Sequence, residues 1–318
     1  MCRLRPYEPI PSMRVTLLAG GTGAAKLAVG LQAELAAGDL TVITNTADDV
    51  DFWGLRVCPD TDAVLFRLAG IFNEQAGFGV ADETFNVYRQ MARLGEPDWF
   101  WLGDRDLAFH LIRTRCLRQG GRLTEAALEI GRRLGLTTRV LPMSDDEVRT
   151  RFLTDRGWLG FQEYFVREKL QPRLERIELS GISEARPSPE ALAAAGEADL
   201  VVIGPSNPLI SVAPITRLLA PALRRERTLA VSPIVGGRAL KGPTVEMMHA
   251  ILGEATPERV AEEYRDFAGR YVLDNLDADR ATAVEAMDYR VLVTDTVMED
   301  PGGARRLASD ILEFRSGR

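Results

Sequence analysis

The sequence predicts an α/β protein with a Rossmann-like, doubly wound and mostly parallel sheet that carries a mixed helical and antiparallel insertion. The first observation is a strand, a turn, a helix and a strand near the start of the chain, with the regular segments at Arg14–Ala19, Ala24–Ala36 and Leu40–Thr44. The second is a pair of later strands, Leu200–Ile203 and Thr228–Val231, which alternate with helical sequence. All four strands are continuously apolar or β-branched, which is typical of parallel strands buried on both faces.

The middle of the chain has a different pattern. A loop is expected over Asn45–Pro59, a helix around Asp60–Gly70, and helical sequence over 82–134 with one break at Glu96-Pro97. From 137 to 179 the pattern is extended and predicts strands of an antiparallel patch at 140–143, 147–152, 161–166 and 173–179. Helices are then expected at 189–195, from Pro214, and at 245–252, 257–268 and 304–314, with short strands at 271–273 and 290–293.

We therefore expect one α/β domain over 13–318, in which 82–180 is an inserted helical and β subregion. Residues 1–12 have no apolar signal-peptide core and are expected to be an N-terminal extension, with Met13 as an alternative start.

Composition limits the class of protein. The chain has 318 residues, of which 46% are hydrophobic and 27% charged, as in an ordinary globular protein. The net charge of −7 argues against a nucleic-acid partner, and no apolar run reaches the length of a membrane span. Three unclustered cysteines fit a reducing cytoplasm.

The turn after the first strand is rich in glycine and predicts a phosphate site. It reads Gly20-Gly21-Thr22-Gly23 and opens a helix that contains Lys26. Glycines let a ligand approach the backbone, and the first turn of a helix presents free N–H groups to an anion. The dinucleotide fingerprint does not fit, because its third glycine would be Lys26 and the second strand ends at Asn45 rather than at a carboxylate. A tight turn without a ligand is the alternative.

Four carboxylates follow the second strand. Asp48 and Asp49 come just after it, and Asp60 and Asp62 open the next helix. So much negative charge beside a phosphate site calls for a cation, and Mg²⁺ binds carboxylates together with phosphate oxygens. We expect Asp48 and Asp62 to be metal ligands, whereas helix capping is an equal alternative for Asp60.

Two later turns also follow buried strands. The first contains Ser206, Asn207 and Pro208, and the second runs from Ser232 to Gly236 and Gly237. Rigid polar loops at strand ends often build sites. Ordinary turns are the alternative, and for the second turn, taken alone, the ordinary turn is favoured.

A helical segment after Trp101 holds another candidate. Asp106, His110 and Thr114 share one helix face, and His110 could act as a general base. A capped helix with a packing histidine is the favoured alternative.

Taken together, these motifs resemble those of the CofD family of 2-phospholactate transferases. The resemblance runs in order from Met13 nearly to the C-terminus. Its motifs lie at 20–27, 45–49, 58–62, 102–114, 141–146, 161–165, 203–208 and 231–237.

The resemblance implies an enzyme of coenzyme F-420 biosynthesis. Such a transferase moves a phospho-acid group, 2-phospholactate or phosphoenolpyruvate, from a guanosine diphospho-linked donor to the deazaflavin precursor Fo and releases GMP. It also implies dependence on Mg²⁺ and a homodimer with a Rossmann-like core.

The resemblance also implies roles for individual residues. Asp48 and Asp62 would hold Mg²⁺, and Asp49 would orient the attacking hydroxyl or support the metal. Fo would lie against Asp62, Trp101, Asp104 and His110. The donor would be held by the following residues: Gly20, Gly21, Thr22, Gly23, Lys26, Asn45, Ser206, Asn207, Pro208, Ser232, Gly236 and Gly237.

Two departures and two rival functions remain. Ala24 and Ala222 stand where the family commonly has glycine. A non-catalytic, nucleotide-sugar-binding regulator that resembles gluconeogenesis factors shares the glycine turn, but the motifs at 58–62 and 102–108 favour the transferase. An NAD-dependent oxidoreductase is disfavoured by the broken fingerprint.

Overall fold

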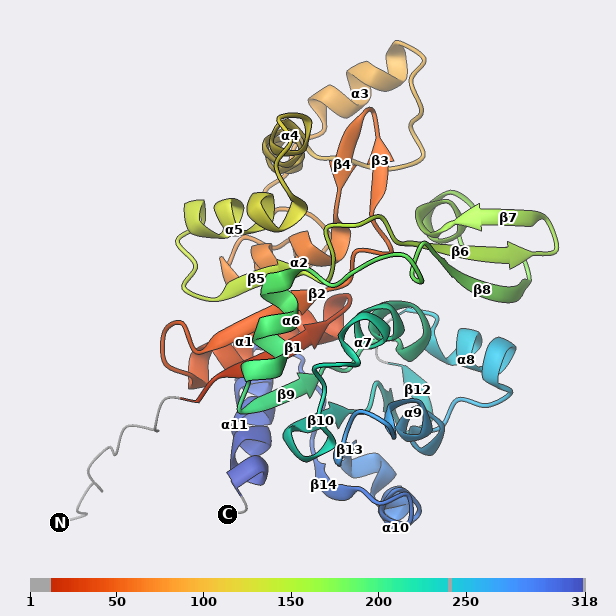
Figure 1. The fold of residues 1–318 in the computed structure, drawn as a ribbon. Helices are drawn as coiled ribbons and strands as arrows, with labels where there is room; N and C mark the ends of the chain where they lie inside the picture. The colour runs from red at the N-terminus through yellow and green to blue at the C-terminus, as the bar shows by residue number, and fades with distance from the viewer. Residues whose placement is uncertain (1–12, 240–241, 317–318) are drawn as a thin grey trace.

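A computed structural model describes residues 13–239 and 242–316, so the predicted extension over 1–12 lies outside the described residues. Its centre is a seven-stranded parallel sheet with the strand order β14-β13-β10-β9-β1-β2-β5 (Figure 1). The strands are β1 (Val15–Ala19), β2 (Leu40–Thr44), β5 (Arg139–Pro142), β9 (Leu200–Ile203), β10 (Thr228–Val231), β13 (Arg270–Asp274) and β14 (Arg290–Thr294). This order confirms the predicted doubly wound fold, because the chain runs outward from β1 in one direction and then restarts beside β1 at β9.

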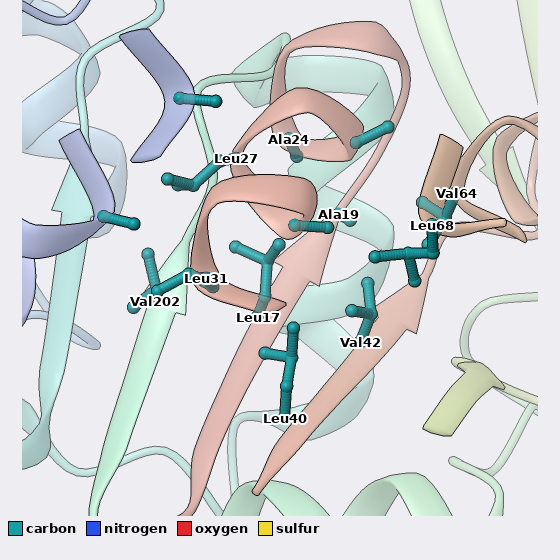
Figure 2. Packing of buried hydrophobic residues seen from close by; sticks show 14 of the residues in the cluster. Leu17, Ala19, Ala24, Leu27, Leu31, Leu40, Val42, Val64, Leu68 and Val202 are labelled. Atoms are coloured by element: carbon teal, nitrogen blue, oxygen red, sulfur yellow. The ribbon is translucent and has the colours of Figure 1, made fainter. Parts of the chain in front are cut away.

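Helices cover both faces of the sheet. On one face, side chains such as Leu17, Val42 and Val202 pack under α1 (Thr22–Glu34), α2 (Pro59–Leu68) and α11 (Pro301–Ser316), as Figure 2 shows in part. The other face, with Leu18 and Ile203, is covered mainly by α6 (Pro189–Glu197), α7 (Ala213–Leu219), α9 (Pro257–Tyr264) and α10 (Ala281–Glu285). Adjacent residues of each strand thus enter opposite cores, which explains why these strands are apolar throughout.

The remaining elements form smaller units at the carboxyl side of the sheet. β3 (Val50–Phe52) and β4 (Leu55–Val57) pair as a hairpin, followed later by α3 (Asn86–Arg93), α4 (Asp104–Arg118) and α5 (Leu123–Arg133). β6 (Arg149–Thr154), β7 (Gly157–Gly160) and β8 (Leu174–Ser180) form a three-stranded antiparallel sheet. β11 (Ile234–Val235) and β12 (Arg238–Ala239) form a second hairpin, and α8 (Thr244–Leu252) follows it.

Several local expectations were wrong. The segment 45–59 is not all loop, because it contains the β3–β4 hairpin, whose positive-φ corner is at Trp53 and Gly54. The predicted strand at 161–166 is replaced by a π-helix over Glu163–Arg167, since its aromatic side chains pack on one side against Phe152. The segment at 140–143 is not in the antiparallel patch, because β5 pairs in parallel with β2 as an edge of the main sheet.

None of the described helices is both long enough and apolar enough to cross a membrane.

Candidate functional site

The glycine turn lies at the switch point of the sheet. It follows β1, and the turn Pro205–Asn207 follows the adjacent strand β9. Gly21 has φ +77° and forms the N-cap of α1 without a side-chain cap, so the first-turn amides of α1 have no cap bond from that residue. The neighbouring glycines are required for packing: a Cβ on Gly20 would overlap Ser211, and a Cβ on Gly23 would overlap the Pro205 carbonyl. An exposed helix N-terminus at a switch point is the expected place for a phosphate.

A cavity of about 490 Å³ opens over this turn. It brings together many of the residues predicted to hold the donor, and these are Gly20, Gly21, Thr22, Gly23, Lys26, Ser206, Asn207 and Ser232. Lys26 donates a 2.7 Å hydrogen bond from Nζ to the Met298 carbonyl. The Ser206 hydroxyl is buried, and none of the residues that the structure describes forms a hydrogen bond with it. We call this cavity the donor cavity, only because residues that the sequence predicts to hold the donor line it.

The other predicted donor residues lie outside the donor cavity's lining. Asn45 is fully buried beneath it, and Pro208 begins a π-helix over Pro208–Val212. Gly236 and Gly237 are exposed in the β11–β12 turn, where the Gly236 amide donates to Asp277 at 2.9 Å. Their positive φ angles of 55° and 74° explain the glycines as turn residues.

Two carboxylates, Asp48 and Asp60, line the donor cavity. Asn45 connects them: its amide donates to Asp60 at 3.1 Å and it also hydrogen bonds Asp48. Burial, reinforced by the charge of Asp60, raises the pKa of Asp48 well above its ordinary value. Burial raises the pKa of Asp60 to about 6, although Asn45 and the Gly21 amide oppose the shift. Two neighbouring carboxyl groups with raised pKa values can bind a cation between them, because the cation balances their negative charge.

Asp48 is held from the antiparallel sheet. Thr150 on β6 donates to its Oδ1 at 3.0 Å, and the Gln162 side chain donates to its backbone carbonyl at 2.9 Å. Sequence analysis did not single out Thr150 or assign a role to Gln162, because only the tertiary fold brings residues more than 100 positions away to Asp48.

Asp49 faces away from the donor cavity. Its Oδ2 accepts a 3.0 Å hydrogen bond from the buried Cys58 thiol, and its Oδ1 has no hydrogen-bond partner in the described part of the chain. Burial raises the pKa of Asp49 to about 7, although the hydrogen bond from the thiol and the charges of nearby arginines act to lower it. Asp49 is therefore buried next to Cys58 and lines neither the donor cavity nor the other cavity described below.

A second, aromatic cavity of about 180 Å³ lies beyond α2, and we call it the acceptor cavity. Phe66, Phe72, Phe100 and Trp101 line it, together with Asp62, Asp106 and His110. Trp101 is 53% exposed at its rim. The two cavities share Gly21, Thr22, Pro59, Asp60 and Gly77, so they meet at the N-terminus of α1.

Asp62 belongs to the acceptor cavity rather than to the cavity of Asp48. Its Oδ1 forms an ion pair with the fully buried Arg113, and its Oδ2 lies 3.7 Å from His110 Nδ1. The structure therefore places Asp48 and Asp60 together in the donor cavity, whereas Asp62 lines only the acceptor cavity. No group of three or more metal-type side chains occurs among the described residues.

Asp104 has a structural environment. Its carboxylate accepts hydrogen bonds from the Asn86 and Val87 amides, each at 3.0 Å, and from the Thr84 hydroxyl at 2.5 Å. These bonds join the start of α3 to α4, and the Thr84 bond is the main cause of a lowered Asp104 pKa. Asp104 does not line either cavity.

The chain is similar to known proteins of one family. A family model described as 2-phospho-L-lactate transferase CofD matches residues 15–300. The chain is 37% identical over 294 residues to the 2-phospho-L-lactate transferase of Methanosarcina barkeri, covering 92% of this chain and 95% of that protein. It is 36% identical over 312 residues to the phosphoenolpyruvate transferase of Streptomyces coelicolor, covering 94% and 97% of the two chains.

A solved structure shares the fold. The crystal structure of a UPF0052 family member from Bacillus halodurans has a TM-score of 0.62, with 16% identity, and the match covers 96% of this chain and all of that one. At this identity the likeness shows the architecture alone.

The family model and the two relatives each match this chain over nearly its full length. They confirm the resemblance drawn from the sequence motifs, and they do not favour the regulatory alternative. The chain is a transferase and belongs to the family described as 2-phospho-L-lactate transferase CofD.

Proposed function

We propose that this protein transfers 2-phospholactate or phosphoenolpyruvate from a guanosine diphospho-linked donor to Fo, as a step of coenzyme F-420 biosynthesis. The observation that carries the proposal is the wall shared by the two cavities at the N-terminus of α1. A diphosphate in one cavity and a flat acceptor in the other would meet there. The relatives' names supply the phospho-acid group.

The chemistry needs positioning and charge neutralisation. The terminal ribityl hydroxyl of Fo forms a bond to the phosphorus that bears the acid, the bond from that phosphorus to the GMP oxygen breaks, and the hydroxyl proton passes to water. The α1 amides, Lys26 and the unpartnered Ser206 hydroxyl would hold diphosphate oxygens. Phosphoryl transfer of this kind depends on orientation and electrostatics more than on covalent catalysis.

The residues also fit a divalent cation. Asp48 and Asp60 would hold Mg²⁺, because both carboxylates line the donor cavity and their pKa values are raised where no cation offsets their charge. When bound, the ion would neutralise negative charge on the diphosphate. Asp49 would support this loop from behind, through its bond to Cys58.

Mass spectrometry tests the proposal. The protein is incubated with Fo, Mg²⁺ and each synthetic guanylated donor in turn, and we expect GMP and the phosphodiester F-420-0 or its dehydro form. The donor that is consumed identifies the acid. A folded protein that forms no phosphodiester from any donor would overturn the proposed function.

A further inference from the structure

Asp106 and His110 project from one face of α4 into the acceptor cavity. They are four residues apart, and both are buried, with 7% and 3% of their surface exposed. Aromatic side chains such as Phe66, Phe72 and Phe100 provide the surrounding walls. A polar pair in a cavity lined by aromatic side chains suits flat rings that carry polar atoms on one edge.

Arg113 determines which nitrogen of His110 carries the proton. Its Nη1 lies 3.2 Å from His110 Nδ1, and an arginine nitrogen can only donate a hydrogen bond. Nδ1 must therefore be the acceptor, which places the proton of the neutral ring on Nε2. Arg113 is itself held by Asp62 and by a 3.2 Å bond to the Arg56 carbonyl. Burial and the charge of Arg113 lower the pKa of His110 to about 4, although the charge of Asp62 acts to raise it. The ring is therefore neutral at pH 7.

Asp106 supplies the complementary atom. Its Oδ1 is buried and has no hydrogen-bond partner within 13–239 and 242–316. Burial is the largest cause that raises the pKa of Asp106 to about 7, and the charges of Asp62 and Glu83 add to it. A buried oxygen without a partner is costly unless a ligand completes it. Among the described residues, His110 forms its polar contacts through Nδ1, and none forms a hydrogen bond with Nε2. The cavity thus offers one donor and one acceptor side by side on α4.

We propose that His110 Nε2–H and Asp106 Oδ1 together recognise a carbonyl and the adjacent ring N–H of the planar acceptor, with Arg113 as the residue that positions His110. This inference rests on the proposed function, because Fo is the flat acceptor assumed. The pyrimidinedione edge of a deazaflavin carries such a carbonyl and N–H. Arg113 and Asp106 act here on the binding of the acceptor and not on bond breaking.

Nuclear magnetic resonance of the ligand-free protein tests the tautomer without any assumption about activity. The chain has two histidines, so the exposed His249 can be removed by His249→Asn to leave His110 alone. In ¹⁵N-histidine protein at pH 7, we expect long-range proton–nitrogen couplings typical of a ring protonated at Nε2. A ring protonated at Nδ1, or at both nitrogens, would overturn the proposal even if transfer to Fo is confirmed.

Kinetics with a modified acceptor tests the recognition pair. Fo methylated at the ring nitrogen between the two carbonyls should be at least about ten-fold poorer than Fo in kcat/KM, because Asp106 then loses its N–H partner. Asp106→Ala, which removes the acceptor oxygen that an asparagine would keep, should raise KM for Fo about ten-fold while KM for the donor stays unchanged. The difference in kcat/KM between Fo and the methylated Fo should then become smaller. The matched control is Asp98→Ala, an exposed aspartate outside both cavities. Equal use of both acceptors by the wild type would overturn the proposal, and transfer to Fo would then still support the proposed function.

Discussion

Asp48 is buried beside Asp60 in the donor cavity, and its position follows from the end of β2. Asn45 bridges the two acids, so the loop between β2 and β3 and the start of α2 are joined at this point. If these two residues hold a metal ion, their negative charge is the property that binds it.

Asp48→Asn should reduce Mg²⁺-dependent transfer by about 100-fold or more, because the amide cannot supply the charge that balances the cation. The variant should still fold, because burial raises the pKa of Asp48 and therefore already disfavours its charged form. A neutral asparagine at this position should not lower the free energy of unfolding through electrostatics. Initial rates at several Mg²⁺ concentrations measure the effect. Asp51→Asn on β3 is the control, because that carboxylate is 57% exposed. Wild-type Mg²⁺ dependence in the Asp48 variant would refute the metal assignment.

The raised pKa of Asp60 predicts a pH dependence of stability. A carboxyl whose pKa is about 6 in the folded state and about 4 when unfolded binds protons more tightly in the folded state. The free energy of unfolding should therefore fall as pH rises from 4 to 7, by roughly 3 kcal/mol at most from this group. Denaturant titrations of wild type and Asp60→Asn without Mg²⁺ measure the difference. The two proteins should diverge across this window, and parallel curves would contradict the shift.

At the scale of elements, the antiparallel sheet holds Asp48 in place. β6 reaches Asp48 through Thr150, and the segment that enters the π-helix Glu163–Arg167 reaches it through Gln162. Thr150→Val removes the 3.0 Å hydrogen bond with little change in volume. At low Mg²⁺ concentration, we expect kcat of this variant to be about ten-fold lower than that of the wild type. At higher Mg²⁺ concentration, kcat of the variant should rise toward the wild-type value. Thr154→Val on the same strand, whose hydroxyl bonds only within the β6–β7 turn, should show no such Mg²⁺ rescue.

Helix packing supplies a prediction about stability alone. Gly30 of α1 lies against α11, and a Cβ there would overlap the Ala304 carbonyl. Gly30→Ala should destabilise the protein by about 1–3 kcal/mol through overpacking. Gly131→Ala in α5 meets nothing closer than 3.5 Å and should be neutral or slightly stabilising. Thermal unfolding of both variants checks this, and equal melting temperatures would contradict the close approach.

At the scale of the whole molecule, the sheet topology places the site. The chain leaves β1 toward β2 and β5, and later returns to β9 on the other side of β1. Loops from both halves therefore diverge above the β1–β9 pair and leave the hollow that the donor cavity occupies. GDP with Mg²⁺ should raise the melting temperature by several degrees, with a stabilisation of about 2.7 kcal/mol at 100 times its Kd. Guanosine without phosphates should give a much smaller shift, and an equal shift would show that the helix terminus does not hold the diphosphate.

The central sheet was largely predictable from the sequence. β2, β9 and β10 lie at the predicted residues, because a strand buried on both faces must be apolar throughout and turn residues mark its ends. The segment at 161–166 was not predictable, since its aromatic run suits a strand as well as the π-helix that packs on Phe152. The dimer and the cytoplasmic location stay predictions.

Local patterns and the order of the motifs were enough to predict the doubly wound fold, the glycine turn before α1 and the family, whereas phosphate binding at that turn stays a prediction. The cavity that each carboxylate lines depends on segments far apart in the sequence: Asp48 shares a cavity with Asp60, and Asp62 is held by Arg113 in the other. Asp60 and Asp62 are two residues apart at the start of one helix, yet only Asp60 also lines the cavity of Asp48. The sequence shows their spacing but not which residues pack around each of them.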